Sequence, residues 1–506
     1  MSVRDLPWGI PRVRPPDPRR DPATLAAALL MVAAAVGMSW LAIHRYDNFW
    51  AGRFDLGNMV QAIWSTTQGR PLESTDTHGE QFVRLGAHVD PILVLFAPLW
   101  AVFPHPQMLL IVQSTAVALG GWPVFWLARR WIGSDAIALG AVAAYLLYPP
   151  LLWSQISEFH PVVLAVPLLL YAIWAIEEDR PAVCAVCVVL ALATKEHVGL
   201  GVVFLGVWCA VAHGRRRWGA ALAVGGLAWT AACMTIIIPR FAPADGENPF
   251  AGRYAHLGGS LTDVPKALLT DPGLVARTVF TEPKMLYLVA LLAPLAFLPL
   301  GSPLLALGAV PEIAMNVLTN YWPQYSVQFQ YTAVATPFLV AAAVRTLGRV
   351  LDSPRLPREA GRPAAWAGLL VVAALAGGWR LGPLPVWYGV PGGSTDRRWE
   401  LESTPHAAAM AEGVALIPRG VPVSAGNPFG ARLSDRRRIF SYPVVGSARW
   451  VIIDMRRPYL ADIMVSPAQF APHALAMRTD PRFRQVFDRD GVMVFRRVAP
   501  SPRVPS

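Results

Sequence analysis

The sequence has little charge and almost no lysine. Only 15% of its 506 residues are Asp, Glu, Lys or Arg, and only 3 of its 44 basic residues are lysine, whereas about a quarter of the residues in soluble domains are charged. Together with 54% hydrophobic residues, this scarcity excludes an ordinary soluble protein. The sequence also has no glycine-rich phosphate loop, no Gly-x-Ser-x-Gly, no HExxH and no internal repeat, so the protein classes that those patterns mark are not indicated.

Cysteine is scarce too, and all four cysteines fall inside apolar blocks. No disulfide is therefore expected. Cys184-x-x-Cys187 has the spacing of a redox or zinc motif, but it lies in a predicted spanning helix without His or further Cys partners. Small residues that pack between helices are the simpler interpretation of this pair.

The formal net charge of +11 does not indicate a nucleic-acid partner. The basic residues are spread over the whole chain, and no basic run carries interleaved aromatic residues, as a nucleic-acid surface would. We therefore expect the lipid bilayer, and no nucleic acid, among the partners.

Apolar blocks of 13 to 21 residues predict an all-α polytopic membrane domain over residues 24–380. Residues 91–103 would reach only ~20 Å as a helix, short of a ~30 Å hydrocarbon core, and are predicted to lie along the outer surface or dip into it. Eleven predicted spans remain: 24–43, 107–127, 136–156, 162–176, 182–194, 198–212, 219–238, 285–300, 303–319, 332–344 and 364–379.

Arginine placement orients these spans. When residues 91–103 are not counted as a span, sixteen basic residues fall in short internal segments. Ten fall in external loops of about twice the length. Because cytoplasmic segments are enriched in Lys and Arg, we predict a multi-pass protein of the cytoplasmic (inner) membrane with its N-terminus in the cytoplasm. External loops are predicted at residues 44–106 and 239–284.

The chain outside the membrane domain divides into four predicted segments. Residues 1–23, rich in arginine and proline, predict a disordered basic cytoplasmic arm. Residues 381–400 predict a linker, 401–498 a small external α/β domain, and 499–506 a disordered tail. The α/β prediction depends on a strand-like stretch at 450–454 and a hairpin that turns at Asp490-Gly491.

The first external loop contains the first of three polar clusters. Asp55 stands in Phe54-Asp55-Leu56-Gly57, where apolar neighbours bring a carboxylate against the membrane domain as a base or a metal ligand. It could equally cap a following amphipathic helix, and the sequence leaves both interpretations open. His88 and Asp90 could face each other across a turn, although a lone His and Asp in a loop are more often structural.

The other two clusters lie at the membrane boundary. Glu158 and His160 stand between two spans with few residues to spare, where ionisable groups are costly and usually kept for a purpose. Lys195-Glu196-His197 joins two short spans, which suits a tip inside a protein-lined cavity, the alternative being a simple charged loop. In a chain with so little lysine, the Lys195 ammonium suits a phosphate near a lipid headgroup, or else pairs with Glu196 for structure.

The order of these motifs resembles a family of polytopic bacterial membrane proteins with a domain of unknown function. The resemblance covers about residues 45–345, and segments around 423–443 and 450–454 look like the family's C-terminal region. That family in turn resembles the GT-C superfamily of integral-membrane glycosyltransferases. The matching motifs are Phe54-Asp55-Leu56-Gly57, His88-Val89-Asp90-Pro91, Phe159-His160-Pro161 and Lys195-Glu196-His197-Val198-Gly199-Leu200.

The resemblance implies transfer of a sugar from a polyprenyl-phosphate-linked donor to a glycan, lipid or protein acceptor outside the membrane. By position, Asp55 would be the base or acceptor-orienting carboxylate, and Lys195 would contact the lipid phosphate. The expected catalytic residues are Asp55, Glu158 and His160, and the expected substrate-binding residues are His88, Asp90, Lys195, Glu196, His197 and Arg253.

Two positions depart from the superfamily pattern. Leu56 stands where better-studied branches have a second acidic residue, so we assign no metal ligands, although a divalent metal cofactor is possible. Gln330 precedes Tyr331 where the resemblance implies His-Tyr, which puts activity in question. Two other functions fit the sequence: a transporter or flippase of a lipid-linked intermediate, and a non-catalytic membrane scaffold. A flippase predicts charges distributed through the bilayer depth and an inverted repeat, and neither is found.

Overall fold

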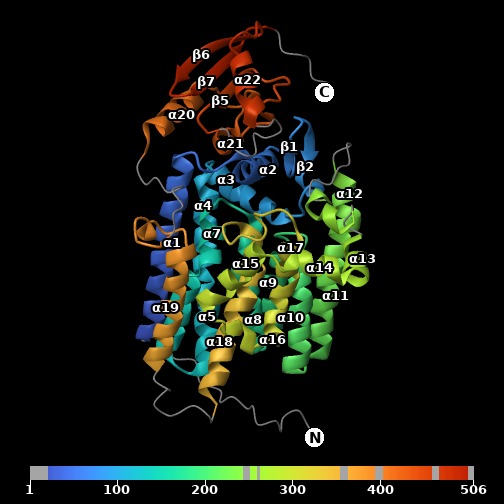
Figure 1. Ribbon diagram of the computed structural model, residues 1–506, viewed down its shortest axis with the longest axis vertical. Helices are drawn as coiled ribbons and strands as arrows, with labels where there is room; N and C mark the ends of the chain where they lie inside the picture. Colours follow the sequence, from blue (N-terminus) through green and yellow to red (C-terminus); the bar gives the residue numbers. More distant parts are fainter. Residues whose placement is uncertain are drawn as a thin grey trace.

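The computed structural model describes residues 21–242, 251–258, 263–353, 363–393, 403–457 and 467–499. Helices form a tall bundle, and a smaller sheet-containing region lies at one end of it (Figure 1). Most of the predicted N-terminal arm, parts of the loop 239–284, residues 394–400 of the predicted linker and nearly all of the predicted tail lie outside the described residues.

Within the described ranges, four helices are long and apolar enough to cross a membrane. They are α1 (Pro22–Asp47), the continuous pair α4 (Gln107–Leu119) and α5 (Gly121–Ile132), α11 (Arg216–Ala232) continued into α12 (Ile238–Phe241), and α19 (Pro363–Leu381). Two bent pairs raise the number to as many as six: α6 (Asp135–Leu146) with α7 (Pro149–Ile156), bent by 47°, and α14 (Pro272–Val279) with α15 (Glu282–Leu292), bent by 65°. The prolines at the second helix of each pair explain the breaks.

Shorter helices make up the rest of the bundle. Each of the other predicted spans is helical, but none reaches spanning length and hydropathy by itself, so the count of eleven stays a prediction. These helices are α8 (Ala165–Glu177), α9 (Pro181–Leu192), α10 (Val198–His213), α16 (Pro303–Ala306), α17 (Val310–Leu318) and α18 (Ala335–Leu351), with α13 (Asp263–Thr270) beside α14.

The proline-bounded segment 91–103 forms a 3-10 turn, Pro91–Phe96, and the short helix α3 (Ala97–Val102). Together with α2 (Asn58–Thr67) and the hairpin of β1 (Glu73–Thr75) and β2 (Gln81–Val83), α3 lies between the bundle and the sheet-containing region (Figure 1). Leu93 and Trp100 are buried, whereas Val102 is 83% exposed. The segment therefore packs with one face on the bundle.

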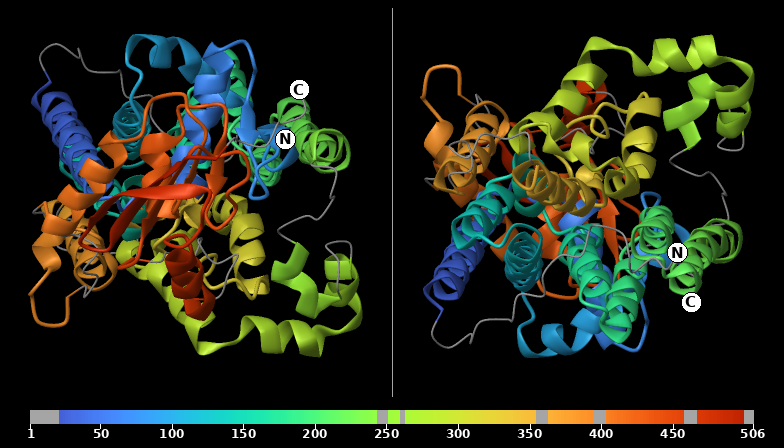
Figure 2. Two further views of the ribbon diagram at one scale, coloured as in Figure 1. Left: turned by 90° about the horizontal axis from the view of Figure 1, so that it is seen from above. Right: turned by 90° about the horizontal axis from the view of Figure 1, so that it is seen from below.

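The C-terminal region is a five-stranded sheet in the order β4-β3-β5-β7-β6. Strands β3 (Val423–Ala425), β4 (Ile439–Ser441) and β5 (Trp450–Asp454) are parallel, and β6 (Phe483–Arg489) and β7 (Val492–Arg497) form an antiparallel hairpin. Asp490 and Gly491 both have positive φ in its turn, as the sequence predicts. Helices α20 (Pro405–Ala415), α21 (Asn427–Leu433) and α22 (Pro467–Ala476) complete the region, which covers one end of the bundle when viewed from above (Figure 2).

Candidate functional site

Asp55 lies on a single π-helical turn, Arg53–Gly57, between α1 and α2. Such turns are rare in proteins, and those that occur are often found at functional sites. Its Oδ1 atom is 3.1 Å from Nε2 of His160, and the Asp55 side chain is 47% exposed whereas that of His160 is 7% exposed. The helix-cap interpretation is wrong: Gly57 occupies the N-cap position of α2, and no side chain caps that helix, because the π-turn carries Asp55 away from it.

The charge of Asp55 is set by its neighbours. Burial of the group opposes ionisation, but the positive charges of His160, Lys195 and Arg84 outweigh it and hold the pKa of Asp55 below its ordinary value. Asp55 is therefore a carboxylate at neutral pH, accessible from one side and supported by an imidazole from the other.

Glu158 holds the loop that carries Asp55. Its carboxyl oxygens accept hydrogen bonds from the backbone N–H groups of Gly52 (3.1 Å) and Leu56 (2.9 Å). Burial and the negative charge of Asp55 raise the pKa of Glu158 well above its ordinary value, against the effect of these donors. Glu158 thus lies beside the Asp55 loop, and its hydrogen bonds are with the protein backbone; its catalytic role stays a prediction.

Gln113 on α4 fixes the segment that presents Glu158 and His160. Its amide nitrogen donates to the carbonyls of Gln155 (2.9 Å) and Glu158 (2.7 Å), and its carbonyl oxygen accepts from the His160 N–H (2.9 Å). Sequence reasoning missed this residue. A fully buried Gln within a predicted span is the signal that could have found it, because unpaired polar groups are costly there.

Asp90 and His88, which the sequence analysis placed across a turn from each other, bond to different residues. Asp90 forms a buried ion pair of 2.8 Å with the guanidinium of Arg84. Sequence reasoning missed Arg84. His88 turns instead to Glu196, with 3.2 Å between Nδ1 and Oε1, and the backbone N–H of Val89 donates to the other oxygen of Glu196 at 3.0 Å. These bonds connect the first external loop to the predicted tip.

Lys195 lies on this tip, between the end of α9 and the start of α10. Its ammonium has no hydrogen-bond or ion-pair partner within the described part of the chain, since Glu196 bonds to His88 and Val89 instead. Burial lowers the pKa of Lys195, opposed by Glu196 and Asp90. His197 Nε2 is 3.4 Å from Glu312 Oε1, which ties the tip to α17.

Arg253 and Tyr331 close the cluster. The Arg253 guanidinium lies 4.1 Å from the ring centre of Tyr321 and 5.8 Å from that of Tyr331. Burial raises the pKa of Tyr331 to about 12, opposed by Arg253 and assisted by the charge of Asp55. The positive charge of Arg253 also contributes to lowering the pKa of Lys195. Gln330, in place of the expected His, is buried.

The structure thus brings the predicted site residues into one electrostatic cluster, to which it adds Arg84, Gln113 and Tyr331. The charge of Lys195 lowers the pKa of both Asp55 and His88, which shows that the first loop and the tip belong to one group of side chains. Among the described residues, no three His, Cys, Asp or Glu side chains come together in a way that could hold a metal ion.

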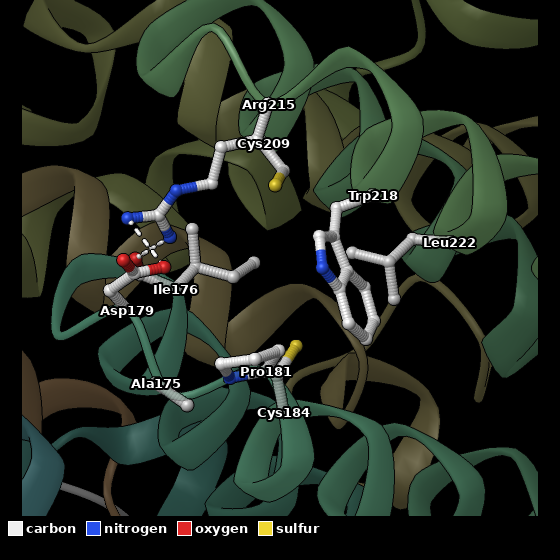
Figure 3. Close-up of a pocket in the computed structure, with 9 residues that line it drawn as sticks. All are labelled: Ala175, Ile176, Asp179, Pro181, Cys184, Cys209, Arg215, Trp218 and Leu222. Atoms are coloured by element: carbon white, nitrogen blue, oxygen red, sulfur yellow. Dashed lines mark hydrogen bonds and ion pairs between the residues drawn. The ribbon is translucent and has the colours of Figure 1, made fainter.

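A separate cavity lies between the ends of α8, α9, α10 and α11 that are remote from Lys195, and Figure 3 draws the residues that line it. Asp179 and Arg215 form an ion pair of 3.0 Å at its edge, and both Cys184 and Cys209 beside it are free thiols. None of the predicted site residues lines it. The lining residues are Ala175, Ile176, Asp179, Pro181, Cys184, Cys209, Arg215, Trp218 and Leu222.

Comparisons with known proteins identify the family and the fold of the chain. Residues 45–492 match the sequence profile of a family described as "Predicted membrane protein (DUF2079)". No curated protein matches the sequence significantly. Eleven chains of solved structures match the fold, among them ArnT from Cupriavidus metallidurans bound to undecaprenyl phosphate, with a TM-score of 0.50 and 12% identity over 94% of this chain and 99% of that chain. At this identity the likeness shows the fold, which is of the GT-C type.

Proposed function

We propose, on the premise that this chain belongs to the DUF2079 family of predicted membrane proteins, that it is an integral-membrane glycosyltransferase. In this proposal it transfers a sugar from a polyprenyl-phosphate donor to an acceptor at the outer face of the cytoplasmic membrane. One observation carries the proposal: an accessible, ionised carboxylate, Asp55, lies in the same cluster as the unpaired ammonium of Lys195.

The donor phosphate is proposed to bind at Lys195. An ammonium without a protein partner can offer its donors to phosphate oxygens in strong, charge-assisted hydrogen bonds. Arg253, which acts on the charge of Lys195, would add a second positive charge. The ArnT structure holds undecaprenyl phosphate, and the shared fold supports a polyprenyl-linked donor for this chain.

The proposed reaction is a displacement at the anomeric carbon of the sugar. An acceptor hydroxyl or amine attacks this carbon and forms the new glycosidic bond, while the bond from the anomeric carbon to the phosphate oxygen breaks. Asp55 takes the acceptor's proton as general base. The leaving phosphate keeps the bonding electron pair, and Lys195 offsets the charge that develops on it. His160 holds Asp55 in its ionised form, and Glu158 positions its loop.

The location of the site is proposed to suit both the polyprenyl tail and the sugar of the donor. The cluster lies at the end of the bundle that faces the C-terminal sheet region (Figure 1). If this end is external, as the arginine distribution indicates, the polyprenyl tail can stay in lipid while the sugar reaches water.

Sugar transfer by purified protein tests the proposal. Radiolabelled polyprenyl-phosphate sugars and candidate acceptors are incubated with wild-type protein, Asp55→Asn and the control Asp179→Asn. Asp179 lies at the opposite end of the helices with a φ of 56°, which Asn adopts readily. We expect transfer by wild type and by the control, and a loss of at least about 100-fold in Asp55→Asn. Equal transfer by all three proteins would remove Asp55 from the mechanism.

A further inference from the structure

The π-turn that carries Asp55 is held from two sides. On the bundle side, Glu158 accepts the N–H groups of Gly52 and Leu56. On the other side, Oδ1 of Asn427 accepts the N–H of Arg53 at 2.8 Å and that of Phe54 at 3.3 Å. Four backbone donors around Asp55 are thus bonded to only two side chains, one from each part of the molecule.

Asn427 comes from the C-terminal sheet region, 374 residues away from Arg53 in sequence. It directly follows β3 and Gly426 and begins α21, where it is buried with 6% exposure. Gly52 allows this approach, because a Cβ atom at residue 52 would collide with the Asn427 side chain. Gly430, one turn along α21, allows the same approach to Arg53.

Other hydrogen bonds fix the sheet region around this contact. The Arg53 guanidinium donates to the Ser441 hydroxyl on β4 and to the carbonyl of Thr75 at 2.8 Å. The Gln61 side chain on α2 donates to the carbonyls of Arg436 and Arg437, at 3.1 Å and 3.0 Å. The hydrogen-bonded groups are buried or half-buried, so the contact is a built interface held by several hydrogen bonds.

From this geometry we propose that Asn427 is a positioning residue, through which the C-terminal region completes the site by setting the Asp55 carboxylate against His160. The inference rests on the proposed function for the role of Asp55. It assigns the C-terminal region a part in the reaction itself, beyond covering the end of the bundle. Without Asn427, the N–H groups of Arg53 and Phe54 would lose their buried acceptor, and the turn would reorganise.

Arg432, five residues further along, provides a matched control. It contacts the bundle as Asn427 does, donating to the carbonyls of Tyr46 and Asp47 and lying over the rings of Tyr46 and Phe49. Among the described residues, no hydrogen bond or ion pair joins Arg432 to the π-turn. Arg432→Ala therefore weakens the interface without removing an acceptor from the Asp55 loop.

Hydrogen–deuterium exchange of the full chain in nanodiscs tests the positioning directly and needs no substrate. We expect the amides of Arg53 and Phe54 to exchange about fivefold faster or more in Asn427→Ala than in wild type. Arg432→Ala should stay near wild type. Asn427→Asp, which keeps an oxygen acceptor at this position, should restore much of the protection. Equal exchange at these amides in Asn427→Ala and Arg432→Ala would overturn the proposal.

The pH profile of sugar transfer separates positioning from mere docking. The charged and titratable groups that act on Asp55 are His160, Lys195, Arg84, Glu158 and Tyr331. If Asn427→Ala moves Asp55 away from His160, the acid limb of the profile shifts to higher pH, whereas Arg432→Ala leaves it in place. An unshifted limb in Asn427→Ala would also overturn the proposal. Absence of transfer by wild-type protein would overturn the proposed function alone, since the exchange result stands without it.

Discussion

At the scale of single residues, the charged groups of the cluster differ in what already satisfies them. Asp90 is paired with Arg84, and Glu196 accepts from His88 and Val89. Asp55 keeps an accessible face, and Lys195 has no bonding partner within the described ranges. In the proposed reaction, a substrate entering the cluster would therefore meet Asp55 as the base and Lys195 as the cation beside the leaving phosphate.

Replacement of Lys195 tests the cation. Lys195→Met keeps most of the side-chain volume but removes the charge, and we expect binding of undecaprenyl phosphate to weaken roughly 10- to 100-fold, the usual effect of losing a charged hydrogen-bond donor. Lys266→Met, on α13 with an exposed side chain, is the control. Titration of both variants in nanodiscs measures the effect, and equal affinities would argue against a phosphate at Lys195.

Replacement of His160 tests the electrostatics of the base. Burial is the largest effect on the pKa of Asp55 and raises it. Among the groups that lower this pKa, His160 has the largest effect. In His160→Gln this pKa should rise, so Asp55 becomes protonated, and inactive as a base, at a higher pH than in wild type. The rate of sugar transfer as a function of pH should show its acid limb displaced upward. A limb that moves downward or stays fixed would contradict this account.

The sequence predicted the residues of this cluster by type and missed their pairing. Lys195 was found because lysine is scarce, and Asp55 because its neighbours are apolar. The pairing of Asp90 was predicted wrongly because an arginine six residues earlier competes for its carboxylate, and only the folded backbone decides which partner lies nearer. Gln330 remains a position at which the expected His is absent.

At the scale of elements, the tip that carries Lys195 depends on how closely α10 approaches α11. A Cβ atom at Gly199 would collide with the carbonyl of Gly226 and the hydroxyl of Thr230. Thr230 also donates to the carbonyl of Glu196 at 2.9 Å, so this helix contact holds the tip in place. A displaced tip would carry the Lys195 ammonium away from Asp55.

Overpacking this contact should destabilise the protein. We expect Gly199→Ala to lower the free energy of unfolding by about 1–3 kcal/mol and to weaken undecaprenyl phosphate binding. Gly225→Ala, on α11 where an added Cβ meets open space, should be neutral or slightly stabilising, because Ala favours helix. Thermal unfolding in detergent compares the two variants. Similar destabilisation by both would show that the α10–α11 contact is not the cause.

The bonds of Glu196 should make the tip sensitive to acid. Burial opposes ionisation, but His88 and Lys195 hold the pKa of Glu196 well below its ordinary value of 4.5. A carboxylate with a lower pKa in the folded state stabilises the fold above its ordinary pKa, and this stabilisation is lost as pH falls through the folded-state pKa. Glu196→Gln should therefore cost about 1–3 kcal/mol near neutral pH and less as the pH falls below 4.5.

The free energy of unfolding, measured near neutral pH and again below pH 4.5, tests this prediction. Glu412→Gln is the control. Glu412 is 51% exposed and pairs with Arg489 far from the tip, so its replacement should have little effect at either pH. A cost for Glu196→Gln that grows as the pH falls would contradict the assigned sign.

Elements with strong local signals were predicted closely. Strand β5 has the predicted bounds 450–454, and the Asp490-Gly491 turn joins β6 to β7. Both follow from local signals, a run of apolar and β-branched residues in β5 and an Asp-Gly turn in the hairpin. The π-turn at Asp55 and the 47° break between α6 and α7 were not predicted. The π-turn depends on tertiary contacts, the bonds of Glu158 and Asn427 to its backbone, whereas the break lies at Pro149 and Pro150, which begin α7.

At the scale of the whole molecule, the sequence predicted a helical membrane part and an α/β region but not how they meet. The bonds between Asn427 and the Asp55 loop join residues that are 374 positions apart, and no periodicity or motif records such a contact. The fold that results has the GT-C architecture of ArnT. It brings Asp55, Lys195 and the C-terminal region to one end of the helical bundle.

The central claim is that Lys195 holds a lipid phosphate beside Asp55. An experimental structure of the full chain in nanodiscs with undecaprenyl phosphate tests this most directly. The account predicts the phosphate within about 3 Å of the Lys195 ammonium, on the accessible side of Asp55, with the polyprenyl chain leading into the bilayer. A phosphate bound elsewhere, for example beside Arg215 at the opposite end of the helices, would contradict it.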